Sequence, residues 1–128
     1  MSNLPQISDS EYELMKIIWE KHPISTNEIC RLAEPLRGWN SKTVHTLLTR
    51  LYHKNAVSYE KKGRMFYYYP LIQKEDYLSQ ETHSFLERFY NGAMAPMLSH
   101  FLSEEAVSDD ELKELSDLIQ SKMKGPLS

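Results

Sequence analysis

The chain has little cysteine and little glycine, and it has no long apolar run. Its single cysteine, Cys30, excludes both an intrachain disulfide framework and a metal site built from several cysteines. The four glycines form no phosphate-binding loop. No apolar stretch approaches the length of a membrane span, and the first residues lack the regions of a signal peptide. We therefore expect a cytoplasmic protein that does not insert into a membrane.

Patterns of catalytic residues are missing as well. None of the five histidines stands three or four residues from another histidine or from Cys30. No Ser/His/Asp or Cys/His arrangement with a recognisable local signature is present. We predict no enzyme, no metal site and no cofactor, and we expect Cys30 to be a small buried hydrophobic residue rather than a redox sensor.

Charge is distributed unevenly along the chain. The whole sequence carries 15 basic and 18 acidic residues, a net charge of −3. Residues 35–70 hold seven basic residues and one acidic residue, whereas residues 1–34 hold three and six and residues 71–128 hold five and eleven. A middle segment of +6 between acidic flanks predicts a local surface for a polyanion, not a generic polycation.

A helix with two different faces is predicted in this basic segment, beginning at Asn40 or Ser41. Its apolar face consists of Val44, Leu47, Leu48 and Leu51. Its polar face consists of Lys42, His45, Thr46, Thr49 and His53. The polar face contains no acidic residue and offers donors of a length suited to base edges and phosphates. An ordinary amphipathic helix with a solvated polar face is the alternative for this helix taken alone.

A β-hairpin is predicted directly after the helix. Residues 56–60 and 64–69 are rich in β-forming residues, and the polar turn Lys61-Lys62-Gly63 separates them. A helix followed by a hairpin with a basic tip is the order of a winged helix-turn-helix, whose helix enters the DNA major groove while the wing contacts the backbone. The predicted DNA-binding residues are Arg37, Ser41, Lys42, Thr43, His45, Thr46, Arg50, Lys54, Lys61, Lys62 and Arg64.

Helix signals divide the chain into two parts. Ser8 with Glu11 and Ser25 with Glu28 match the capping box. They predict helices over about 9–21 and about 26–33, the second stopped by Pro35. The predicted fold is mainly α with a small β-hairpin wing: a winged helix-turn-helix over residues 1–72 and a helical dimerisation module over residues 73–128.

The predicted C-terminal helices carry more apolar surface than about 50 residues can bury alone. A symmetric homodimer would let two copies share one core, and packing back onto the winged helix in a monomer is the alternative. The predicted dimerisation residues are Leu78, Phe85, Phe89, Met97, Leu98, Phe101 and Leu115.

Several segments together resemble the BlaI/MecI penicillinase-repressor family. They are residues 8–21 (SDSEYELMKIIWEK), 39–55 (WNSKTVHTLLTRLYHKN) and 66–70 (FYYYP). The resemblance covers about residues 7–122 and implies a dimeric winged-helix repressor of a palindromic DNA operator. It also implies a membrane-bound sensor protease as a partner, which inactivates the best-known members when a β-lactam is detected. The copper-responsive branch carries a C-terminal cysteine cluster, which this chain lacks.

Two positions depart from the family pattern. His45 occupies the position of an arginine, which implies a different operator sequence or affinity. The family is cut at an Asn-Phe bond, and the corresponding pair here is His100 and Phe101. Two other functions remain open at this point: a winged-helix regulator that responds to a small molecule, and a winged-helix module that binds protein.

Overall fold

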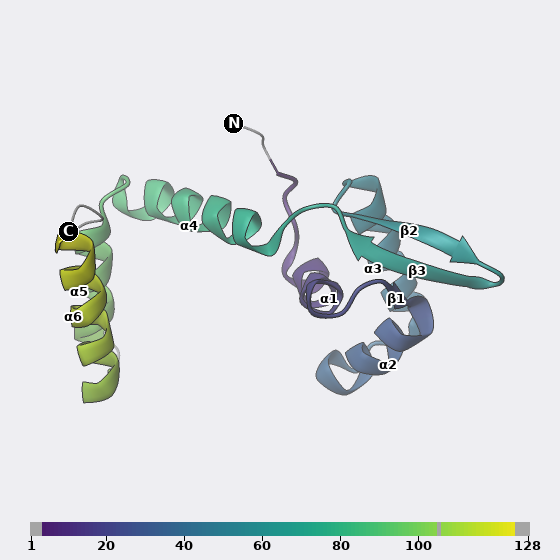
Figure 1. Cartoon of the computed structure of the whole chain (residues 1–128), viewed down its shortest axis with the longest axis horizontal. Helices are drawn as coiled ribbons and strands as arrows, with labels where there is room; N and C mark the ends of the chain where they lie inside the picture. The colour runs from purple at the N-terminus through teal and green to yellow at the C-terminus, as the bar shows by residue number, and fades with distance from the viewer. Residues whose placement is uncertain (1–3, 105, 125–128) are drawn as a thin grey trace. The chain divides into compact units, whose positions relative to one another are not determined.

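The structure, a computed structural model, describes residues 4–104 and 106–124. Backbone contacts divide the chain into two compact units, the first ending at Glu81 and the second beginning at Thr82. Figure 1 shows the elements of each unit. Within the described residues no helix combines the length and the apolar character that crossing a membrane requires.

The first unit begins with two capped helices. Helix α1 (Asp9–Glu20) starts at a complete capping box, in which the Ser8 hydroxyl accepts the Glu11 N–H and the Glu11 carboxylate accepts the Ser8 N–H. Helix α2 (Thr26–Arg37) starts at Ser25, whose hydroxyl accepts the Glu28 N–H. These starts confirm the predicted helix signals.

A third helix and a small antiparallel sheet complete the first unit. Helix α3 (Ser41–His53) is followed by β2 (Val57–Lys62) and β3 (Met65–Pro70), which pair along their whole length. The short strand β1 (Ile24–Ser25) pairs with the other edge of β3, giving the order β1-β3-β2. The predicted fold class, mainly α with a β-hairpin wing, is confirmed.

The core of the first unit lies between α1, α2, α3 and the sheet. The apolar face predicted for α3 is buried: Val44, Leu48 and Leu51 have no exposed area and Leu47 is 5% exposed. From α1, Leu14 and Ile18 meet them in the same cluster. Cys30 is half-buried against this core, and burial raises the pKa of its thiol. Helix α3 is therefore held by its inner face, and its outer face is exposed.

Two local predictions were wrong, and one short strand was missed. Helix α2 continues through Pro35 to Arg37, because a proline in the last turns removes only one backbone hydrogen bond and Gly38, with φ of 66°, closes the end by donating its N–H to Glu34 O. The hairpin turn is Gly63-Arg64, since Gly63 has φ of 65° and the strands pair as far as Lys62 and Met65. Strand β1, only two residues long, was not predicted at all.

The first turns of α4 (Lys74–Tyr90) belong to the first unit. Tyr77 is 3% exposed, stacks on Tyr12 with ring centroids 6.1 Å apart, and lies 6.1 Å from the Trp19 ring. The Trp19 indole N–H donates to Ile72 O at 2.9 Å. The Gln80 side chain accepts from the Leu4 N–H and donates to Leu4 O. The start of α4 is thus packed on α1 and on the segment before it.

We expect Tyr77→Ala to lower the free energy of unfolding of the first unit by about 3 kcal/mol, because it removes a buried aromatic ring and leaves a cavity between α1 and α4. Urea denaturation followed by tryptophan fluorescence measures the loss. Leu71→Ala is the control, because Leu71 is 49% exposed and its truncation should cost about 1 kcal/mol or less. Equal losses for the two variants would contradict the packing of Tyr77 described above.

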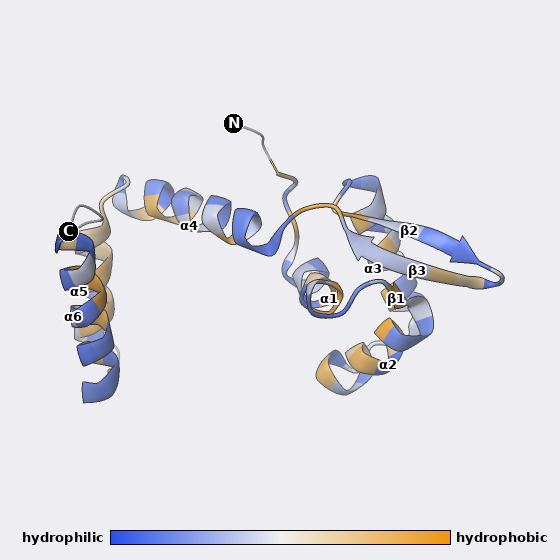
Figure 2. Cartoon of the chain, viewed as in Figure 1, coloured by the Kyte–Doolittle hydropathy of each residue, from blue (hydrophilic) through white to orange (hydrophobic). Residues whose placement is uncertain are grey.

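The second unit consists of the rest of α4, α5 (Met94–Glu104) and α6 (Asp109–Lys124). Helix α4 ends before Asn91 and Gly92, which have φ of 50° and 81°. No residue of α5 or α6, both wholly within the described part of the chain, is buried. Orange and blue segments alternate along α6 in Figure 2. The second unit therefore exposes most of its large apolar side chains, although Leu86 on α4 is buried.

Candidate nucleic-acid interface

Helix α3 presents a polar outer face. Its N-terminus is capped by the Asn40 side chain, which accepts the Thr43 N–H at 2.9 Å. The residues predicted for base or phosphate contact on the outer face are exposed: Ser41, Lys42, His45, Thr46 and Arg50. The same face therefore offers cations, hydroxyls and an imidazole along three turns of one helix.

Two threonine hydroxyls on α3 are oriented by the helix itself. Thr46 Oγ1 donates to Lys42 O at 3.0 Å, and Thr49 Oγ1 donates to His45 O at 2.9 Å. Each hydroxyl has used its hydrogen and retains lone pairs directed away from the backbone. These threonines are therefore suited to accept hydrogen bonds, such as those from base amino groups, while Lys42 donates.

An open hollow of about 540 Å³ lies beside α3. Its lining residues are Ser8, Ser10, Trp39, Lys42, Thr43, Thr46, Leu47 and Arg50. Ser8 and Ser10 belong to the start of α1, where the helix dipole favours negative charge. The hollow thus combines two basic side chains, hydroxyls and a helix N-terminus, which together suit a phosphate group.

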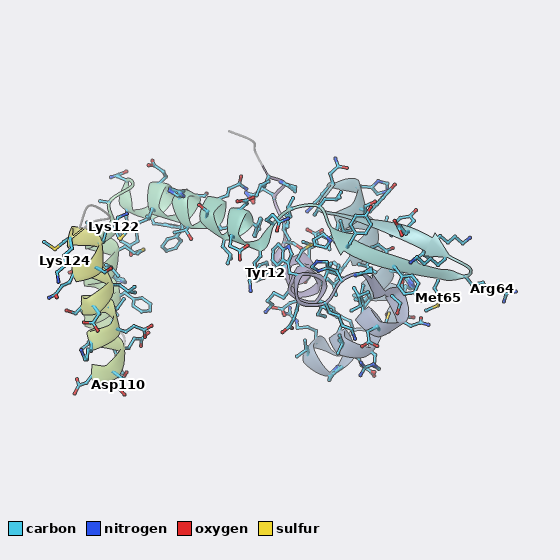
Figure 3. The ribbon with its side chains drawn as sticks, in the orientation of Figure 1. Tyr12, Arg64, Met65, Asp110, Lys122 and Lys124 are labelled. Atoms are coloured by element: carbon cyan, nitrogen blue, oxygen red, sulfur yellow. The ribbon has the colours of Figure 1, made fainter. Side chains whose placement is uncertain are left out.

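The wing carries its cations on both faces of the hairpin. Lys61 lies opposite Phe66 and Lys62 opposite Met65, and Arg64 forms the turn with Gly63. The Lys61 ammonium lies 5.6 Å from the centre of the Phe66 ring, and the Lys62 ammonium lies 5.8 Å from that of Tyr67. Arg64 projects at the far end of the hairpin (Figure 3), and all three cations are exposed.

Exposed aromatic rings join the wing to α3. Tyr59 lies 5.1 Å from both Tyr52 and Phe66, measured between ring centroids, and 5.4 Å from Tyr68. Tyr52, Tyr59 and Phe66 are 36–40% exposed. The Tyr52–Tyr59 contact places the wing against the end of α3, so the two elements that carry the exposed cations touch each other.

Two of the predicted DNA-binding cations are paired with acidic side chains of the protein. Arg37 contacts Glu13 at 3.5 Å, and its guanidinium lies 5.1 Å from the centre of the Trp39 ring. The Lys54 ammonium bonds to the buried Glu11 carboxylate at 2.6 Å and to Gln6 O at 2.8 Å. The remaining predicted cations have no such acidic partner among the ion pairs of the described residues.

Acidic groups near the basic surface are few. One is Asp9, which is exposed in the first turn of α1 between the hollow-lining residues Ser8 and Ser10. Glu60 is the only acidic residue between 35 and 70. On α2, Glu28 accepts hydrogen bonds from Arg31 and Lys21, which lower the pKa of its carboxyl to about 2. Within the described part of the chain, no three His, Cys, Asp or Glu side chains come close enough to hold a metal ion.

Four of the seven predicted dimerisation residues are exposed, and the other three are half-buried. Exposed fractions are 40% for Leu78, 46% for Phe85, 57% for Phe89 and 55% for Phe101. Met97, Leu98 and Leu115 are half-buried. The Phe85 and Phe89 rings lie 5.1 Å apart on α4. His100 and Phe101, the predicted cleavage pair, are both exposed within α5.

Sequence reasoning missed several residues of this surface. Ser8 was identified only as a helix cap, and Ser10, Trp39, Tyr59 and Phe66 were not assigned to the interface. The capping box locates the start of α1, but its position beside α3 arises from packing between helices that are distant in sequence. Alternation along β2 and β3, with Tyr59 and Phe66 on the face that also carries Lys61, was the available signal for the wing aromatics.

Comparisons with known proteins point to one family. A profile described as penicillinase repressor matches residues 7–121. The chain is 42% identical to the penicillinase repressor of Bacillus licheniformis over 120 residues, covering 94% of each protein. It is 34% identical to the methicillin resistance regulatory protein MecI of Mammaliicoccus sciuri over 117 residues, covering 91% of this chain and 95% of that one.

Two solved structures resemble the chain. One is the DNA-binding domain of the repressor BlaI, with a TM-score of 0.54 and 44% identity. The other is the monomeric form of Bacillus licheniformis BlaI in complex with the blaP half-operator, with a TM-score of 0.53 and 44% identity. Each match covers 60% of this chain and 94% of the solved chain.

Proposed function

The chain belongs to the penicillinase repressor family, and from this premise we propose that it is a homodimeric transcriptional repressor that binds a palindromic DNA operator. The observation that carries the proposal is the set of exposed cations on the outer face of α3, beside the hollow and on the wing. A similar domain, BlaI at 44% identity, was solved with an operator half-site.

The residues divide between base and backbone contacts in this proposal. Lys42, Thr43, His45 and Thr46 lie on the N-terminal half of α3, which in a helix-turn-helix reads base edges. Arg50 and the wing cations Lys61, Lys62 and Arg64 contact phosphates in this proposal, and Ser41 contacts a phosphate at the start of α3. Residues up to 72 read DNA, and residues 73–128 hold two subunits together.

Salt dependence tests the proposal. If about four cations per subunit contact phosphates, a dimer makes about eight contacts, and log affinity against log salt should fall with a slope of about −7. Lys62→Ala removes two contacts per dimer and should make the slope shallower by about 2. Gel-shift titrations at several salt concentrations measure both.

Lys113→Ala, on α6, is the control and should leave the slope unchanged, because the side chain is exposed and paired with Asp117 in the second unit. A flat salt dependence for the wild-type chain would remove the nucleic-acid proposal and favour a winged-helix module that binds protein.

We extend the proposal to a proteolytic switch through a membrane sensor protease, on the basis of the family resemblance. Cleavage between His100 and Phe101 would separate α6 and part of α5 from α4 and so remove apolar surface needed for the dimer. A monomeric DNA-binding domain loses the affinity that comes from binding two linked half-sites, and it dissociates from the operator.

His100→Asn restores the family's Asn-Phe pair, so we expect faster cleavage in induced cells and no loss of operator affinity before induction. Mass spectrometry should detect a fragment that begins at Phe101. An intact repressor in derepressed cells would rule out this route of induction.

A further inference from the structure

Lys54 stands at the end of α3, and although its side chain is 36% exposed, its ammonium bonds back to the segment before α1 and to α1 itself. Its backbone N–H caps α3 by donating to Arg50 O at 3.0 Å. Its ammonium lies 2.6 Å from Glu11 Oε1 and 2.8 Å from Gln6 O. Two of its three N–H donors are therefore used within the protein, unlike those of the wing lysines.

The partner carboxylate is buried and depends on this contact. The side chain of Glu11 is 2% exposed, and its Oε1 also accepts the Ser8 N–H at 2.9 Å. Burial raises the pKa of Glu11, but hydrogen bonds from Lys54 and from the Ser8 N–H, together with the Lys54 charge, lower it by more, so the pKa lies below its ordinary value. At neutral pH the contact is therefore a charged pair. Removing one partner leaves the other charge without its counter-ion, which is unfavourable for a buried group.

This pair, which we call the Glu11–Lys54 clamp, joins the end of α3 to the first turn of α1. The same two elements line the hollow of the candidate interface: Ser8 and Ser10 come from α1, and Lys42, Thr46 and Arg50 come from α3. A shift of α3 relative to α1 would change the spacing between these groups. Recognition requires such groups to be held to within a fraction of an ångström by their supporting contacts.

We propose that Lys54 is a positioning residue that acts through Glu11 to fix the recognition helix against the start of α1, and that it does not contact phosphate. The inference rests on the proposed function and refines it, because it removes one cation from the DNA-binding set predicted from the sequence. The two roles make opposite predictions for Glu11→Gln. A phosphate-binding Lys54 would be released by that change and would bind DNA more tightly, whereas a positioning Lys54 would lose its anchor and weaken binding.

The test uses the full chain as wild type, Glu11→Gln, Lys54→Met, the double variant and Lys54→Arg, with Lys62→Ala as the reference for a phosphate contact. The probes are a duplex enriched by the wild-type chain from a random-sequence library and an unrelated duplex of equal length. Affinities are measured at several salt concentrations, at a temperature where circular dichroism shows every variant folded.

We expect Lys54→Met and Glu11→Gln each to weaken binding to the enriched duplex about 10-fold, with the salt slope and the affinity for the unrelated duplex unchanged. The double variant should bind no more weakly than either single variant, since both remove the same contact. Lys54→Arg should restore most of the affinity, because arginine can also donate to Glu11.

Three results would overturn the inference while leaving the proposed function intact. The first is a salt slope for Lys54→Met that is shallower by about 2, as expected for Lys62→Ala. The second is tighter DNA binding by Glu11→Gln. The third is unchanged DNA affinity in folded variants that have lost only thermal stability. A wild-type chain that binds neither duplex would instead reject the proposed function, and the positioning role with it.

Discussion

Replacing Phe89 by aspartate is expected to lower operator affinity by about 10²–10⁴-fold, the advantage that two linked half-sites give over one. Phe89 is 57% exposed and lies 5.1 Å from Phe85, which is 46% exposed. Burying one phenyl ring stabilises an interface by about 1.5–3 kcal/mol, and a symmetric dimer buries each ring twice. An aspartate there would bring an unpaired charge into the interface, which is strongly unfavourable.

Sedimentation at micromolar concentration should show a wild-type dimer and a Phe89→Asp monomer, and gel shifts should show the loss of affinity. Ser84→Asp is the matched control: it adds the same charge at an exposed position of the same helix, on the side of α4 away from Phe85 and Phe89. It should remain dimeric. A wild-type monomer at this concentration would contradict the proposed assembly.

Lys42→Ala should cost about 1–3 kcal/mol at the operator, or about 5–150-fold in affinity, with little loss on unrelated DNA. Lys42 is exposed in the first turn of α3, beside Thr46 and Arg50 on the rim of the hollow. In the proposed complex Lys42 reaches a base edge in the major groove, so we expect its removal to relax sequence preference at one base pair of each half-site.

Lys62→Ala provides the contrast, because a wing lysine contacts the backbone and should weaken binding to all duplexes alike. Parallel titrations of the two variants on operator and unrelated DNA separate the roles. Equal losses of Lys42→Ala on both duplexes would show that Lys42 binds phosphate instead of a base.

Much of the first unit could be predicted because its signals are local. The spacing of Val44, Leu47, Leu48 and Leu51 predicted the buried face of α3, and the capping box at Ser8 gave the start of α1, as the structure confirms. Membership of the penicillinase repressor family, suggested by the resemblance of residues 39–55 and others, is also confirmed.

The features that were missed depend on contacts between distant segments. Two residues of β1 carry no periodicity, and only their pairing with Tyr68 and Tyr67 makes them a strand. In the sequence, Lys54 is one more cation in a basic segment. Nothing in its neighbourhood shows that Glu11, 43 residues away, accepts a hydrogen bond from its ammonium. Composition gives the charge of a surface, but tertiary packing decides which cations remain available to a partner.

Selection of duplexes from a random-sequence library by the full chain tests the central claim most directly. We predict enrichment of one palindromic sequence whose half-sites are separated by about one turn of DNA, about 10 base pairs, or a multiple of it, as two α3 helices related by a two-fold axis require. Failure to enrich any sequence, or enrichment of a single half-site with no symmetric partner, would contradict a dimeric operator-binding repressor.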